Sequence, residues 1–365
     1  MKSPLRILMT ACGAPGAPGI LKCLRNNGER EIFVYGVDMD PNAVGFAMVD
    51  DRQVCRPGLS EGYAEEILEI AKRERLQVVL PLSTMELDAL SNAKGAFEEA
   101  GSKVLVSDAE GLSIANNKAK LMAAAKGCGV AVPESYRVTS IEAFEQTVKR
   151  LGFPDRPVCF KPEFGKGSRG FRILDSTHDK FKALFDQKPA SAHMSLEEAV
   201  SVLGQRESIP PLLVMEYLLG DEYSVDVLCD KGESLVVVPR VRTKIKLGIC
   251  FTGRTEKHEK LIEFSKTLIR QLSLNYCINL QFKVGADGIP KLLEINPRVS
   301  GTIILCAGAG VNLPYLAIKL AVAEPLGEIT PSWGVRMVRY WDEVFYDERG
   351  RPFAIPGKLD RLHRG

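Results

Sequence analysis

Apolar residues in the first third of the chain fall in short runs that alternate with segments of helical periodicity. The runs predict strands at 6–10, 32–37, 78–81 and 103–106, and the first helix is expected near Ile20. Strands that alternate with helices in this way predict a parallel, doubly wound sheet.

The middle of the chain changes to a different pattern. A helix is predicted from 116 to 125, and two strands at 158–161 and 171–174 surround a glycine-rich loop. Two strands joined by such a loop indicate a hairpin rather than a strand-to-helix phosphate loop. A further helix is predicted over 195–203.

The last third is richer in strands. We expect a helix over 260–272, and the glycines of 285–288 predict a hairpin turn between the last two strands. The predicted strands are 212–215, 223–228, 235–238, 277–282 and 291–295. Residues after 331 are expected to add a final strand pair beside a cleft in the protein.

Composition and charge narrow the function classes. The 365 residues are 45% hydrophobic and 26% charged with a net charge of +2, which is typical of a globular protein of two or three domains and not of a nucleic-acid binder. Nine scattered cysteines and four dispersed histidines favour free thiols in a reducing compartment over a zinc site. With no signal-peptide pattern and no bilayer-length apolar stretch, a cytoplasmic protein is expected.

The turn from Gly13 to Gly19 has two interpretations. Its glycines suggest a dinucleotide site, and thus an NAD-dependent oxidoreductase, but they recur at every third position and two prolines crowd the turn. We favour the alternative, a tight strand-to-helix turn that helps to shape a substrate cleft.

Lys161 ends an apolar strand immediately before the glycine-rich loop. A lysine there is costly to bury unless it meets an anion, and glycines let backbone N–H groups approach phosphate oxygens. The loop that would cover a polyphosphate contains Gly165, Lys166, Gly167, Ser168 and Arg169. An exposed hairpin with solvated charges is the alternative.

The segment from Glu294 to Arg298 carries the most specific pattern. Glu294 and Asn296 alternate and so share a strand face, which Gln281 can join from the adjacent strand. Such oxygen ligands suit Mg²⁺, and Arg298 is placed to stabilise charge during phosphoryl transfer. A salt-bridged strand end is the alternative.

Other candidates are weaker. The strand end at Glu216, Tyr217 and Leu218 could hold adenine, with Glu222 on the ribose, although a plain strand-to-loop connection is the better interpretation. Arg240 and Arg242 would share a face if their segment is a strand, and would then bind a substrate carboxylate or form a solvated basic face. Glu86 is placed to hold a substrate amine, or simply begins a helix.

These segments, in this order, resemble the ATP-grasp superfamily, and within it a single half of the carbamoyl-phosphate synthetase large chain. The resemblance covers roughly residues 1–330. It is carried by Asn116-Asn117-Lys118 with Val130-Ala131-Val132-Pro133, by Val158-Cys159-Phe160-Lys161-Pro162, by Leu280-Gln281-Phe282, and by Glu294-Ile295-Asn296-Pro297-Arg298-Val299-Ser300-Gly301.

The resemblance implies an α/β fold with a Rossmann-like N-terminal domain at 1–112 and a two-lobed ATP-grasp domain at 113–330. The lid lobe would span about 130–215 and the metal-bearing lobe about 216–330, with an extension at 331–365. ATP and Mg²⁺, or Mn²⁺ in its place, would bind in a cleft between the lobes.

The resemblance also implies roles for individual residues. Lys118 and Lys161 would contact phosphates under the glycine loop, Glu216 to Leu218 would hold adenine, and Glu222 would hold ribose. Gln281, Glu294 and Asn296 would hold the metal. Arg298, Lys161 and Arg169 would be catalytic, and Gly301 would lie at the substrate.

The implied activity is an ADP-forming carboxylate–amine ligase that passes through an acyl phosphate. Small acids and amines would be its partners, with a homodimer as a further expectation and no nucleic acid or membrane. The alternatives are a non-catalytic ATP-binding subunit or sensor, and a subunit like carbamoyl-phosphate synthetase. The chain has length for only one of that enzyme's two halves, which favours a stand-alone ligase.

Overall fold

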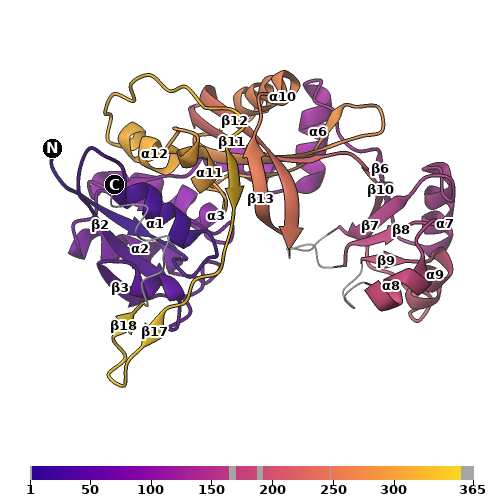
Figure 1. Cartoon of the computed structure of the whole chain (residues 1–365), viewed down its shortest axis with the longest axis horizontal. Coiled ribbons are helices and arrows are strands. Elements are labelled where there is room, and N and C mark those ends of the chain that lie inside the picture. Colours follow the sequence, from indigo (N-terminus) through magenta and orange to yellow (C-terminus); the bar gives the residue numbers. More distant parts are fainter. Residues whose placement is uncertain (1, 164–169, 187–191, 247, 355–365) are drawn as a thin grey trace. The chain divides into compact units, whose positions relative to one another are not determined.

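The computed structural model describes residues 2–163, 170–186, 192–246 and 248–354 (Figure 1). Its contacts divide the chain into two compact units. Unit 1 comprises Met1–Val130, Glu222–Phe282 and Glu294–Gly365, and unit 2 comprises Ala131–Asp221 and Lys283–Leu293. The domain and lobe limits expected from the sequence stay a prediction.

Unit 1 begins with the predicted parallel sheet. Its five strands lie in the order β3-β2-β1-β4-β5, and every neighbouring pair is parallel. This strand order is typical of a Rossmann-like domain. The elements are β1 (Leu5–Met9), α1 (Ala17–Arg25), β2 (Ile32–Asp38), a short 3₁₀ helix η1 (Val44–Ala47), β3 (Asp51–Val54), α2 (Tyr63–Arg73), β4 (Val78–Leu80), α3 (Leu87–Asn92), α4 (Lys94–Glu99), β5 (Lys103–Val104), α5 (Ala109–Ala115) and α6 (Lys118–Gly127).

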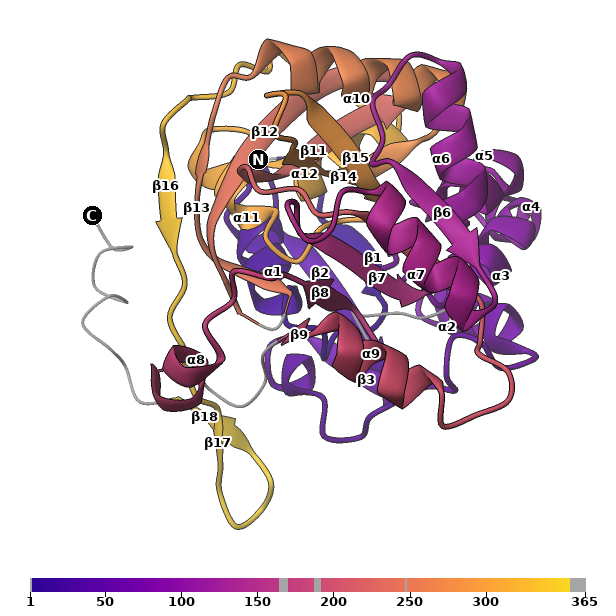
Figure 2. The ribbon, with the colours of Figure 1, turned by 90° about the vertical axis from the view of Figure 1, so that its right-hand side faces the viewer.

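A second sheet of six strands, in the order β15-β14-β11-β12-β13-β16, holds the predicted metal strands. Helix α10 packs against β11 and β12 (Figure 2). Its elements are β11 (Glu222–Asp230), β12 (Glu233–Lys246), β13 (Ile249–Thr255), α10 (Glu259–Gln271), β14 (Tyr276–Val284), β15 (Pro290–Asn296), α11 (Ile304–Gly308), α12 (Leu313–Ala321) and β16 (Arg336–Val338).

The C-terminal segment only partly follows the expectation of a final strand pair. β16 alone joins the six-stranded sheet, antiparallel to β13. The next strands, β17 (Phe345–Tyr346) and β18 (Pro352–Phe353), pair with each other as a separate two-stranded sheet.

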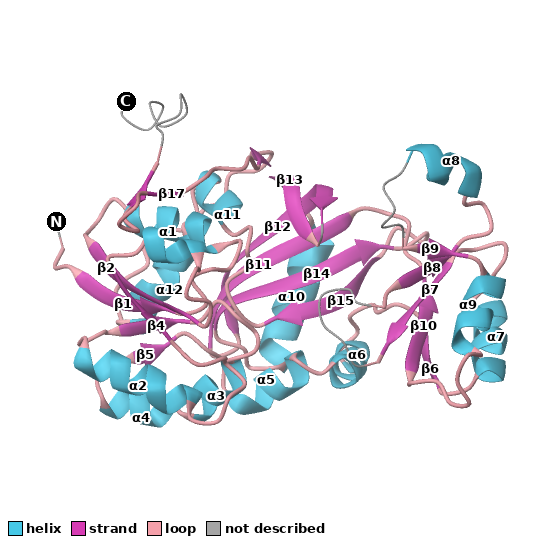
Figure 3. Cartoon of the chain, turned by 90° about the horizontal axis from the view of Figure 1, so that it is seen from below, coloured by secondary structure: helices cyan, strands magenta, loops and turns pink. Residues whose placement is uncertain are grey.

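Unit 2 contains the predicted hairpin, with β7 (Val158–Pro162) antiparallel to β8 (Arg172–Leu174). Both lie in a five-stranded sheet of order β6-β10-β7-β8-β9, and α7 and α9 pack together beside it (Figure 3). The remaining elements are β6 (Ser135–Val138), α7 (Ile141–Arg150), α8 (Lys180–Asp186), β9 (His193–Met194), α9 (Leu196–Leu203) and β10 (Leu212–Glu216). The turn at 285–288 also forms, because the N–H of Gly288 donates to the carbonyl of Gly285.

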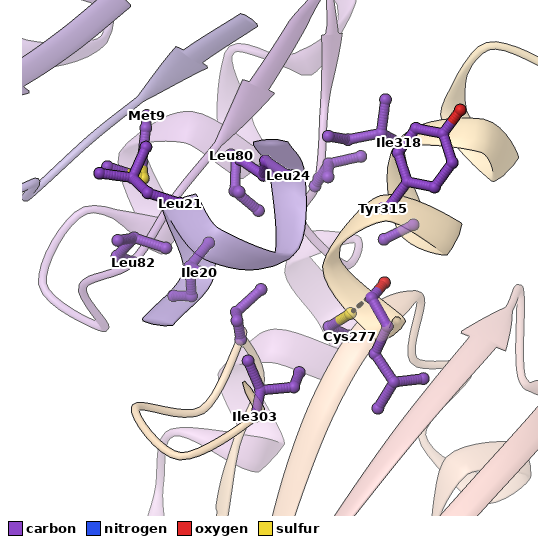
Figure 4. Packing of buried hydrophobic residues seen from close by; sticks show 14 of the residues in the cluster. Met9, Ile20, Leu21, Leu24, Leu80, Leu82, Cys277, Ile303, Tyr315 and Ile318 are labelled. Atoms are coloured by element: carbon purple, nitrogen blue, oxygen red, sulfur yellow. Dashed lines mark hydrogen bonds between the residues drawn. The ribbon is translucent and has the colours of Figure 1, made fainter. Parts of the chain in front are cut away.

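The core of unit 1 joins stretches that are far apart in the sequence. Apolar side chains from α1 recur at helical spacing, as Ile20, Leu21 and Leu24, and they pack with Tyr315 and Ile318 of α12 (Figure 4). All nine cysteines have free thiols, and eight of them are buried, as the sequence predicts. In the described part of the chain, no helix has both the length and the apolar character needed to cross a membrane.

An ion-pair cluster also ties α12 to the N-terminal segment. The carboxylate of Glu29 lies 2.6 Å from Lys2 and 2.8 Å from Lys319, and Glu324 pairs with Lys2 and Arg30. The hydrogen bonds from Lys2 and Lys319 lower the pKa of Glu29 to about 2.

The stability of the protein should therefore depend on Glu29 at acid pH. Because the pKa of Glu29 is lower in the folded chain than in the unfolded one, its contribution is complete above about pH 4.5 and is lost as the pH falls toward about 2. We expect Glu29→Gln to lower the urea midpoint at pH 6 and to flatten its decline between pH 5 and pH 3. The exposed neighbour variant Glu31→Gln serves as the control, and an equal effect of both variants would contradict the assignment.

Candidate functional site

Polar residues alternate along four neighbouring strands of the six-stranded sheet. Because alternate residues share a strand face, the polar side chains gather on one side of the sheet. They lie toward the end of the sheet where β15 leads into the loop that contains Arg298. They are Glu222, Ser224 and Asp226 of β11, Arg240 and Arg242 of β12, Asn279 and Gln281 of β14, and Glu294 and Asn296 of β15.

The predicted metal ligands lie on β14 and β15, which are neighbours in this sheet. The side-chain amide of Asn296 donates to the Glu294 carboxylate over 3.0 Å. Arg242 donates to the Gln281 side-chain oxygen over 3.4 Å. All three predicted ligands are half-buried and present oxygen atoms, so the donor set is suited to a hard cation such as Mg²⁺.

Arg298 follows β15 directly. Its guanidinium donates to the Val299 carbonyl over 2.8 Å and reaches the Asn296 side-chain oxygen at 3.5 Å, while its Nε is buried without a partner in the described part of the chain. Burial lowers the pKa of Arg298, and the charge of Glu294 opposes that shift. Arginine stays protonated even so, which leaves a partly desolvated cation beside the predicted ligands.

A cavity of about 230 Å³ opens beside these residues within unit 1. Gln281, Asn296 and Arg298 line it, and so does the predicted substrate residue Gly301. Its other lining residues are Ala14, Pro15, Gly16, Ala17, Ile20, Leu82, Ser224, Arg242, Gly248, Ile249, Cys250, Asn279, Val299, Ser300, Thr302 and Arg339.

Residues of the glycine turn before α1 line this cavity, and the expectation that the cavity holds a substrate stays a prediction. Gly16 packs so closely on Gly301 that a Cβ on Gly16 would lie 2.5 Å from the Gly301 Cα. The N–H of Gly13 donates to Asp38 over 2.8 Å. The turn is thus occupied by contacts within the protein.

The two arginines of β12 differ from each other. Arg242 lines the cavity, pairs with Glu222 and donates to the Gly248 carbonyl over 2.6 Å. Arg240 is 1% exposed and does not line the cavity. The segment is a strand, as both interpretations of these arginines assumed. Arg240 is nevertheless neither on a solvated face nor in the cavity wall, because its hydrogen-bond partners enclose it.

Arg240 instead supports the loop that carries the cavity residues. It pairs with the buried Asp226, and it donates to the Thr302 side chain over 2.9 Å and to the Ser300 hydroxyl over 3.2 Å. Asp226 also accepts from Asn279 over 2.8 Å. The ion pair thus fixes the loop after Arg298 to the sheet.

Glu86 does not line the cavity either, although its charge acts on Arg298. It is 2% exposed and accepts from Thr10 over 2.7 Å, from the Tyr63 hydroxyl and from the N–H of Ser83. Burial raises its pKa, which these hydrogen bonds partly oppose. It begins α3, as the second interpretation expected, and Leu82 is the residue of its loop that reaches the cavity.

The predicted ATP residues fall on both units. Lys118 begins α6 in unit 1, and Lys161 lies near the end of β7 in unit 2, beside β10. Glu216 accepts from Lys291 over 2.6 Å and from the N–H of Glu134, and Lys283 lies over the Tyr217 ring. Leu218 is buried. Gly165, Lys166, Gly167, Ser168 and Arg169 lie outside the described residues.

Sequence reasoning missed several polar residues of this site, and three of them, Asn279, Ser224 and Asp226, lie on its strands. Asn279 and Ser224 line the cavity, and Asp226 accepts a hydrogen bond from Asn279. Along its strand, each of the three lies two positions from a selected residue or from another of the three. The alternation of polar residues on the strands could therefore have identified them. Arg339 follows a strand without such alternation of selected residues.

Two family models match the chain. "ATP-grasp in the biosynthetic pathway with Ter operon" matches residues 208–342, and "PylC-like, N-terminal domain" matches residues 7–105. Residues 208–342 thus match an ATP-grasp family, and the resemblance to the ATP-grasp superfamily seen in the sequence is confirmed. The chain has the expected α/β fold with a parallel N-terminal sheet.

Individual relatives agree with this assignment. The carbamoyl phosphate synthase large chain of Rubrobacter xylanophilus is 24% identical over 327 residues, which cover 85% of this chain and 29% of that protein. The chain therefore spans less than a third of the length of that curated relative.

Solved structures show the same fold. The biotin carboxylase domain of the Hydrogenobacter thermophilus 2-oxoglutarate carboxylase, a complex with MgADP and bicarbonate, matches with a TM-score of 0.65 and 16% identity, over 91% of this chain and 73% of that one. The L-amino acid ligase of Bacillus licheniformis matches with a TM-score of 0.59 and 16% identity, over 91% and 78%.

Proposed function

We propose that this chain is an ADP-forming ligase that activates a carboxylate as an acyl phosphate for attack by an amine or ammonia. The observation that carries the proposal is the cavity, which the predicted ligands Gln281 and Asn296 and the cation Arg298 all line. A site built only to bind a nucleotide does not need an arginine beside the predicted metal ligands, and it does not need a further cavity wall for an acid substrate.

Mg²⁺ and ATP are the cofactors of this proposal, with Mn²⁺ as a second candidate metal. Gln281, Glu294 and Asn296 would hold the ion, which supplies charge neutralisation for the phosphates when bound. Lys118, Lys161 and the loop from Gly165 to Arg169 would contact phosphates, Glu216 to Leu218 adenine, and Glu222 ribose. Glu222 already pairs with Arg242, so its carboxylate would have to accept hydrogen bonds from both Arg242 and the ribose hydroxyls.

The chemistry has two balanced steps. A carboxylate oxygen attacks the γ-phosphorus, the bond from that phosphorus to the bridging oxygen breaks, and ADP leaves. The amine nitrogen then attacks the acyl carbon, phosphate leaves, and the nitrogen loses a proton. Arg298 would donate to the acyl phosphate oxygens, and its partial burial makes those hydrogen bonds stronger than they would be in water.

A screen for product tests the proposal. The chain is incubated with Mg-ATP and pooled small acids and amines, and the release of ADP and phosphate is expected. Release of AMP and pyrophosphate would contradict it. ATP binding with no product from any pool would favour the alternative, a nucleotide sensor.

The setting of the reaction is part of the same proposal. Nine free thiols support a cytoplasmic location, because the cytoplasm keeps thiols reduced. A homodimer is also proposed, since the similar biotin carboxylase domain is described as a dimer.

A further inference from the structure

The cavity wall in unit 1 is unusually one-sided in charge. Three arginines line it, Arg242, Arg298 and Arg339, and no aspartate or glutamate is among the residues that form it in the described part of the chain. A wall of this kind attracts anions and offers no carboxylate to an ammonium group.

Two of these arginines already have counter-charges close by. Arg242 pairs with Glu222 and donates to Gln281 and Gly248. Arg298 has no ion pair with a described residue, but it lies next to Asn296, and the charges of Glu294, Asp226 and Glu86 act on it. Each of these two arginines therefore lies within the field of at least one carboxylate.

Arg339 differs from both of them, because no described aspartate or glutamate acts on its charge. Its guanidinium donates to the Gly301 carbonyl, and, like Arg298, it has no ion pair with any residue that the structure describes. Burial lowers its pKa, and the nearby Arg240 lowers it further. Arg339 is half-buried and lines the cavity, so a ligand anion there could form a charge-assisted hydrogen bond with it and complete this part of the wall.

The rest of the wall limits the size and shape of that ligand. Ala14, Pro15, Ile20, Leu82 and Ile249 present carbon atoms, and the cavity measures about 230 Å³. Such surroundings suit a short hydrocarbon segment between two charged ends.

We propose that the acid substrate is a compact dicarboxylate without an ammonium group. One carboxylate lies toward Arg298 for activation, the other is held by Arg339, and the carbon chain between them lies against the apolar wall. This inference rests on the proposed function for the activation step, but the binding of the dianion by Arg339 can be tested without turnover.

The experiment measures binding to the full chain by calorimetry, with Mg²⁺ and a non-hydrolysable ATP analogue present. The probes are the C3 to C6 dicarboxylates, the monocarboxylates of equal length, and aspartate and glutamate, which add an ammonium group. We expect at least one dicarboxylate to bind about tenfold or more tightly than both its monocarboxylate and its amino analogue, as one charge-assisted contact predicts.

Arg339→Ala should weaken the binding of that dicarboxylate by about 10- to 100-fold. It should leave the affinities for the corresponding monocarboxylate and for the ATP analogue unchanged. Arg339→Lys should recover part of the loss. Arg336→Ala, which removes an exposed arginine from the adjacent strand β16, is the matched control and should bind as the unaltered chain does.

Several outcomes would overturn the inference. They are tighter binding of an amino acid or a monocarboxylate, no binding of any dicarboxylate, and an equal loss for both classes of acid in Arg339→Ala. Dicarboxylate binding that depends on Arg339 but yields no ADP with any amine would support the inference and contradict the ligase proposal, so the two failures are distinguishable.

Discussion

Replacing Glu294 by glutamine is expected to lower the rate of ADP release by about a hundredfold or more. Glu294 is the only carboxylate among the three predicted ligands on β14 and β15. Its loss would remove the negative charge that would attract Mg²⁺ to the three predicted ligands. The glutamine side chain has the same shape and can still accept from Asn296, so the fold should remain intact.

The measurement is the initial rate of ADP release over a series of Mg²⁺ concentrations, because a lost ligand also raises the concentration that is required. Glu233→Gln is the control, since it changes an exposed carboxylate on β12 of the same sheet. Normal activity of Glu294→Gln at low Mg²⁺ would show that Glu294 holds no metal.

The Asp226→Ala substitution is expected to lower the free energy of unfolding of unit 1 by about 3–5 kcal/mol. Asp226 and Arg240 are each 1% exposed, and the substitution leaves a buried guanidinium without its counter-ion. It also removes the acceptor for Asn279 and for the Cys306 thiol. Both chain tryptophans, Trp333 and Trp341, belong to unit 1, so their fluorescence during urea unfolding reports on the correct unit.

Two controls make this measurement specific. Glu259→Ala breaks an exposed ion pair with Lys257 and should cost less than about 1 kcal/mol. The double variant Asp226→Leu with Arg240→Met removes both charges and should regain much of the lost stability. If Asp226→Ala lowered the free energy of unfolding no more than Glu259→Ala, the buried ion pair would contribute no more to stability than an exposed one.

The sequence predicted those parts of the fold that repeat a local pattern. The parallel sheet, the β7–β8 hairpin and the strands of the predicted metal residues were found because each element shows its own periodicity. Strand β12 shows where this reasoning weakens. It runs unbroken from Glu233 to Lys246, whereas the apolar run alone indicated only 235–238.

The surroundings of single residues were harder to predict. Arg240 is buried by partners about 60 positions further along the chain, namely Ser300 and Thr302, and no local pattern encodes that contact. Arg339 reaches the cavity wall because β16 pairs with β13, although the paired residues are more than 80 positions apart in the sequence. Long-range pairing of this kind depends on the whole fold rather than on the residues near each position.

Unit 1 is built from three separate stretches of the chain, and this has a consequence during synthesis. Its core joins Ile20 and Leu24 of α1 to Tyr315 and Ile318 of α12, nearly 300 residues later. At about 5–20 residues per second, a ribosome needs on the order of tens of seconds to supply those partners. Through that interval the apolar side of α1 lacks its final cover, which makes the nascent N-terminal sheet a natural client for a chaperone.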